Sequence, residues 1–117
     1  MEIVYANKKV ERTCKDLKYA KRIMEERFAI SLMKKIRFIE ESEVLHDLVM
    51  YKPFNFHSLR GNRSGTFALD VAGRNCVYRI IIEPLDVNGS RYDNPNIDAI
   101  SKSTKIVLIL EVSDHYE

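Results

Sequence analysis

Apolar residues recur with two different periods along this chain, and the change of period separates helices from strands. Glu2 to Tyr5 is short, β-branched and aromatic, which predicts an opening strand. Apolar residues then recur every three or four positions, which predicts an amphipathic helix from Lys8 to about Lys18 and a second from Ala20 to Ile39. No Gly or Pro marks the boundary between the two helices, which we place at Asp16 or at the Leu17-Lys18 junction.

The second half of the chain follows a period of two. Val44 to Met50 is apolar enough for one more turn of helix, and Pro53 ends it. Alternation then predicts strands at 55–59, 66–72, 76–83 and 105–112. The last of these is nearly all apolar, which indicates a central strand covered on both faces. The segment from Pro84 to Thr104 has little periodicity and is expected to be a long surface loop or a hairpin extension.

The order of these elements predicts an α+β fold. Two N-terminal helices should pack on one face of a mostly antiparallel, four- to five-stranded sheet and leave the other face open. A chain of 117 residues has room for one core, so we expect a single domain, 1–117, with a loop insertion at about 84–104.

Composition indicates the compartment in which the protein acts and the kind of partner it has. The start of the chain lacks the pattern of a signal peptide, and no apolar run approaches the roughly 20 residues that span a bilayer. Cys14 and Cys76 belong to no CxxC pair, so we interpret both as reduced packing residues of a cytoplasmic protein. The net charge is only +2, but residues 7–40 carry 11 Lys and Arg against 5 Asp and Glu. This asymmetry indicates either a polyanionic partner or a solvated helix face.

The turn from His57 to Gly65 carries the densest candidate chemistry. Its two glycines let the backbone bend, which should bring His57, Arg60 and Arg63 close together. Two guanidinium groups and an imidazole suit a phosphate, because arginine offers a planar fork of donors. The alternative is a solvated basic hairpin.

Arg79 is unusual because it lies on a strand among apolar neighbours. Alternation places it on the same face as Val77 and Ile81. A charge in such surroundings needs a partner. That partner is either a bound phosphate or one of three carboxylates, those of Asp70, Glu83 and Glu111.

Several blocks of the chain, taken in order, resemble the HigB branch of the RelE/ParE toxin superfamily. One block runs from His57 to Asp70, and its part from His57 to Gly65 is the sharpest. The others are Ile3-Val4-Tyr5 with the Lys-rich stretch after it, Tyr78-Arg79-Ile80, and Leu110 to Tyr116. The resemblance implies a toxin of a type II toxin-antitoxin pair that cuts messenger RNA in the ribosomal A site, as a metal-independent endoribonuclease without a cofactor. It also implies a cognate antitoxin, expected to be a small helical DNA-binding protein, with the ribosome and mRNA as further partners and no membrane.

The resemblance also assigns roles to residues. His57, Arg60 and Arg79 stand where the family has site residues, and the tail Asp114-His115-Tyr116 stands where it commonly has Asp-Tyr-His. Arg60, Arg63 and Arg79 would then bind the RNA phosphate. The altered order of the tail matters because adjacent residues at a strand end point to opposite faces. Either His115 or Tyr116 faces the substrate, or the tail is rearranged so that both do.

Two other functions stay open at the level of the sequence. One is a ParE-like toxin that inhibits DNA gyrase, although such a protein has no need of paired proton-transfer groups. The other is a toxin-like fold kept as a non-catalytic binding module. Which residue would act as acid and which as base is not assigned by the sequence.

Overall fold

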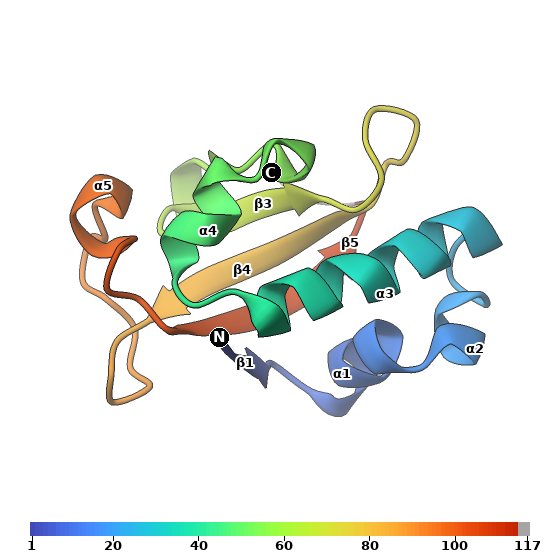
Figure 1. Cartoon of the computed structure of the whole chain (residues 1–117), viewed down its shortest axis with the longest axis horizontal. Coiled ribbons are helices and arrows are strands. Elements are labelled where there is room, and N and C mark those ends of the chain that lie inside the picture. The colour runs from blue at the N-terminus through green and yellow to red at the C-terminus, as the bar shows by residue number, and fades with distance from the viewer. Residues whose placement is uncertain (115–117) are drawn as a thin grey trace.

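A five-stranded mixed sheet forms the centre of the fold in the computed structural model, which describes residues 1–114 (Figure 1). The spatial order of the strands is β1-β5-β4-β3-β2. β1 runs parallel to β5, and the other three pairings are antiparallel. The strands are β1 Glu2–Tyr5, β2 His57–Ser58, β3 Phe67–Asp70, β4 Arg79–Leu85 and β5 Ile106–Ser113. The chain is therefore α+β, with a sheet that is antiparallel except at β1.

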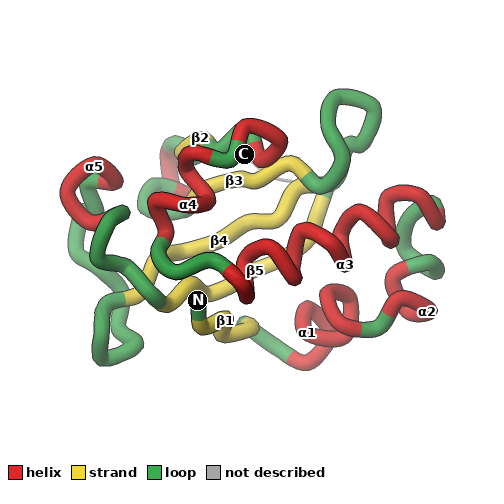
Figure 2. The backbone as a smooth tube through the Cα atoms, in the orientation of Figure 1, coloured by secondary structure: helices red, strands yellow, loops and turns green. Residues whose placement is uncertain are grey.

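Helices cover one face of this sheet, as the tube in Figure 2 makes plain. The helices are α1 Lys8–Lys15, α2 Leu17–Ala20, α3 Glu26–Glu41, α4 Leu45–Met50 and α5 Ile97–Ile100. Among residues 1–114 none of these helices has the length and apolar character needed to cross a bilayer.

The helical region is more broken than the periodicity predicts. Asp16 interrupts the first helix, because its carboxylate accepts a hydrogen bond from the Tyr19 backbone N–H and so starts α2. The second helix was expected from Ala20, but α3 begins only at Glu26. Ala20 and Met24 are both buried, so the apolar spacing continues through a turn that is not part of α3.

The main core lies between the helices and the sheet. Ile80 and Ile82 of β4 are fully buried there, together with Val107 and Ile109 of β5. On the opposite face of β5, Leu110 is only half-buried, so the expected cover on both faces is incomplete. Both cysteines are buried and free, and burial raises the pKa of Cys14 to about 12. A buried thiol with a raised pKa fits a packing role.

The segment at 84–104 is more ordered than a surface loop. β4 continues through Leu85, and a tight turn follows in which the Asp86 carboxylate accepts from two backbone N–H groups. After α5, the carbonyls of Ser101 and Thr104 accept hydrogen bonds from the backbone of α4. This insertion is therefore fastened to the helical layer.

Candidate functional site

The sheet surface opposite the helices carries two of the candidate residues, His57 and Arg79. Ile80 and Ile82 point into the core. Arg79 and Ile81 alternate with them along β4 and so point to the other face. The strand register then carries this face across the sheet, since residues paired directly across strands share a face. We call this surface the candidate face, and its members are His57, Ala68, Asp70, Arg79, Ile81, Glu111 and Ser113.

The basic turn folds over the candidate face. Gly61 and Gly65 adopt φ values of 66° and 91°, and a short 3-10 turn, Gly61–Arg63, lies between them. Leu59 is 7% exposed and packs on Ala68 and Ile81 in a small second core. The sequence marks this anchor only as an isolated leucine in a polar turn, and its role is visible only in the structure.

The anchored turn delivers Arg63 to the far side of the candidate face. Its Nη2 donates to Oε1 of Glu111 on β5 over 3.0 Å, and the two side chains are 28% and 35% exposed. Glu111 lies opposite Ile81, and Ser113 lies opposite Arg79. Arg63 therefore reaches the part of β5 that adjoins Arg79.

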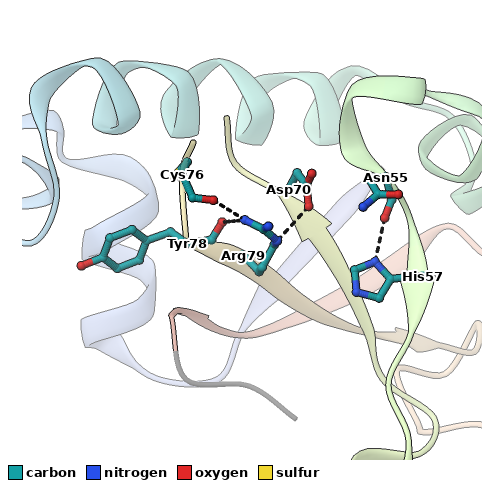
Figure 3. A network of polar contacts seen from close by, with 6 residues as sticks. All are labelled: Asn55, His57, Asp70, Cys76, Tyr78 and Arg79. Atoms are coloured by element: carbon teal, nitrogen blue, oxygen red, sulfur yellow. Dashed lines mark hydrogen bonds and ion pairs between the residues drawn. The ribbon is translucent and has the colours of Figure 1, made fainter. Parts of the chain in front are cut away.

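Arg79 is held at the end of the sheet by partners on three neighbouring residues (Figure 3). Its Nε lies 2.8 Å from Oδ1 of Asp70, the residue opposite it on β3. Its Nη1 donates to the backbone carbonyls of Cys76 and Tyr78. The side chains of Arg79 and Asp70 are only 15% and 9% exposed. Of the carboxylates named as candidate partners, Asp70 is the one that pairs with this arginine.

His57 occupies the opposite edge of the candidate face. Its Nδ1 lies 2.8 Å from the carbonyl oxygen of Asn55 (Figure 3). A carbonyl only accepts, so Nδ1 carries the proton, and in the neutral ring Nε2 is the unprotonated nitrogen. His57 and Arg79 lie two strands and two residues apart, so their Cα atoms are roughly 12 Å from each other. Long side chains and a bound phosphodiester can span such a gap.

The structure places Arg60 apart from these contacts. Its side chain is exposed, and it lines a hollow of about 500 Å³ between the basic turn and residues 95–97 of the insertion. Of the other described candidate residues, neither His57 nor Arg63 lines this hollow. Arg60 therefore does not share this hollow with His57 or Arg63.

Asp114 directly follows β5 and lies close to α1. It is exposed and lines a pocket of about 420 Å³ together with Tyr78, Glu111 and the α1 residues Val10 and Thr13. The Tyr78 hydroxyl donates to the carbonyl of Ile23 over 2.9 Å, and burial together with the charge of Asp114 raises its pKa. The predicted site residues His115 and Tyr116 lie outside the described residues. Within 1–114 no three His, Cys, Asp or Glu side chains are grouped as a metal site.

Comparison with known proteins identifies a fold. No protein-family model matches the chain, and no curated protein matches its sequence. Among solved structures, a YoeB/ParE toxin from Agrobacterium tumefaciens aligns with a TM-score of 0.56 and 13% sequence identity, covering 99% of this chain and all of that one. At this identity the match concerns the fold alone. The chain therefore has a fold similar to that of a YoeB/ParE toxin.

Proposed function

We propose that this protein is the toxin of a type II toxin-antitoxin pair, of the HigB-like branch of the RelE/ParE superfamily, and that it cuts messenger RNA on the ribosome. The observation that carries the proposal is the candidate face, where His57, Arg63 and Arg79 lie on one surface of a toxin-like fold. The protein would act in the cytoplasm, as a metal-independent endoribonuclease.

The proposed reaction needs a base, an acid and cations. His57 Nε2 takes the proton of the ribose 2'-hydroxyl, O2' bonds to phosphorus, and the bond from phosphorus to the 5'-oxygen breaks. The products are a 2',3'-cyclic phosphate and a 5'-hydroxyl, whose proton comes from an acid on the protein. Either His115 or Tyr116 supplies that acid in this proposal, with Asp114 beside them in the site. Arg79 and Arg63 stabilise the charge that grows on the phosphate, with Arg60 gripping an adjacent phosphate.

The proposed function implies a cognate antitoxin and the ribosome as partners. A cognate antitoxin, small, helical and DNA-binding, would neutralise the toxin. The ribosome would supply much of the substrate positioning, which suits a chain with a net charge of only +2.

A second function is favoured by one observation. Arg63 and Arg79 both pair with carboxylates of the same chain, as they would in a fold that binds a partner protein without handling phosphate. This observation favours a ParE-like gyrase inhibitor or a non-catalytic binding module. The toxicity of either kind of protein would not depend on His57.

Induced expression in a bacterial host separates these functions. Growth and primer extension on a translated messenger are read together for wild type, His57→Ala and Arg79→Ala, with Lys102→Ala on the exposed side of the insertion as the control. The nuclease predicts growth arrest and new 5' ends that require translation, both lost in the two site variants and kept in the control. Arrest without new ends would transfer the proposal to gyrase inhibition, and the absence of arrest would indicate a non-toxic relative.

A further inference from the structure

Asp70 is a buried aspartate at the end of a strand, paired with the arginine of the neighbouring strand. It ends β3 directly opposite Arg79, the first residue of β4, and its side chain points to the candidate face. Only 6% of the residue is exposed. An aspartate is rarely buried this far unless its charge is paired, and here the pair is with Arg79.

The contact between the two residues is part of a larger clamp. Asp70 holds Nε of Arg79 at 2.8 Å, while the carbonyls of Cys76 and Tyr78 hold Nη1. The carboxylate comes from β3 and the carbonyls come from the segment just before β4. Carbonyl hydrogen bonds at Nη1 and the ion pair at Nε therefore hold the guanidinium from two sides.

The second arginine of the candidate face lacks such a clamp. Among the described residues Arg63 pairs with the carboxylate of Glu111, and both members of that pair are about twice or more as exposed as those of the Arg79 pair. A partly exposed pair is screened by water and easily exchanged for another anion. The burial of the Asp70 pair suits a fixed geometry, and that of the Glu111 pair does not.

We infer that Asp70 is a positioning residue that fixes the guanidinium of Arg79 for contact with an RNA phosphodiester. The inference rests on the proposed function and extends it, because no role for Asp70 beyond that of an ion-pair partner follows from the resemblance. Asp70 itself touches no substrate. It acts through Arg79, by holding the plane of the guanidinium before the phosphate arrives.

A variant series on ribosomes programmed with a short messenger tests the inference under single-turnover conditions. Asp70→Ala removes the carboxylate that pairs with Nε, and we expect the cleavage rate at saturating protein to fall about 10- to 100-fold, as misplaced catalytic groups do. The protein concentration for half-maximal rate should change less than about 3-fold, because the charge of Arg79 remains. Asp70→Asn keeps the volume of the side chain but removes its charge, so its rate should fall about 10- to 100-fold as well, because the ion pair and not the packing holds the guanidinium.

A double-mutant cycle shows whether the effect passes through Arg79. Lysine has no planar guanidinium to orient, so in the Arg79→Lys protein the further change Asp70→Ala should alter the rate by less than about 2-fold. Asp98→Ala removes the same charge from an exposed site on α5 and serves as the control, with wild-type kinetics expected. Thermal melting accompanies each variant, and Asp70→Ser, too short to reach Nε, replaces Asp70→Ala if the alanine variant does not fold.

Three results would overturn the inference. Wild-type rates in Asp70→Ala or in Asp70→Asn would show that the charge of Asp70 does not set the geometry. An equal loss in the wild-type and Arg79→Lys backgrounds would show that Asp70 does not act through Arg79. Absence of cleavage by the wild-type protein would instead overturn the proposed function, and the inference with it.

Discussion

Leu59 is the residue on which the geometry of the basic turn depends most. Its side chain is 7% exposed and fills the space between the turn and Ala68 and Ile81. Leu59→Ala removes three carbons, each worth about 0.8 kcal/mol on burial, or about 2.4 kcal/mol in total. The cluster is small and lies under a turn that can settle, so the added cost of a cavity is modest. We expect a loss of about 2 to 3 kcal/mol.

This loss should appear in two measurements. For a chain of this length about 1 kcal/mol corresponds to about 4 °C, so the melting temperature should fall by about 8 to 12 °C. If the turn instead lifts off while the rest stays folded, trypsin should cut after Arg60 or Arg63. Cleavage of that open state would rise roughly 30- to 150-fold, in proportion to its population.

Val87→Ala provides the control, since this side chain is 85% exposed at the tip of the turn after β4. It should leave both measurements close to wild type. A Leu59→Ala protein that melts within about 2 °C of wild type, with cleavage at the turn unchanged within about 3-fold, would refute the idea that Leu59 anchors the turn.

Three further predictions concern other parts of the molecule. Tyr78→Phe removes the hydrogen bond to the Ile23 carbonyl and should cost about 1 kcal/mol in urea unfolding. The pKa of Tyr78 is raised in the folded state, so its contribution to stability is present below pH 10.0 and is lost as the pH rises through the folded pKa. Tyr78→Phe should lack this part of the loss of stability at alkaline pH. Parallel curves of unfolding free energy against pH for the two proteins would contradict this expectation. Cys14 and Cys76 should both resist a thiol reagent at pH 8 until the protein is unfolded, and fast labelling of either would contradict their burial. Binding of a short RNA should weaken steeply with salt, and replacing the exposed Arg37 of α3 by Ala should reduce the slope of log affinity against log salt by about 0.7 if it contacts a phosphate, with no change if it does not.

Much of the fold follows from patterns that act locally. The alternation of Phe67 and Leu69 places β3, and the spacing of Leu32, Ile36 and Ile39 places α3, because each period reports which side of an element meets apolar neighbours. The same patterns place the start of the second helix at Ala20, whereas α3 begins at Glu26, because Ala20 and Met24 keep the apolar spacing through a turn outside the helix. The break at Asp16 is one of the two expected, and there the carboxylate accepts from the backbone N–H of Tyr19.

The candidate site divides in the same way. The sequence alone identified the basic turn and Arg79, because a charged residue between apolar neighbours is visible without any knowledge of the fold. It could not choose Asp70 over Glu83 or Glu111 as the partner of Arg79, because that choice depends on the register between β3 and β4.

Only the tertiary structure decided which segments, distant along the chain, contact one another. Arg63 meets Glu111 across 48 positions, and Leu59 meets Ile81 through the packing of a turn on a sheet. β1 lies parallel beside β5 although nearly the whole chain separates them. A hydrophobic period fixes which face of an element is buried, but the identity of the neighbour is set by how all the elements pack at once, and the charges on the candidate face take their partners from that packing.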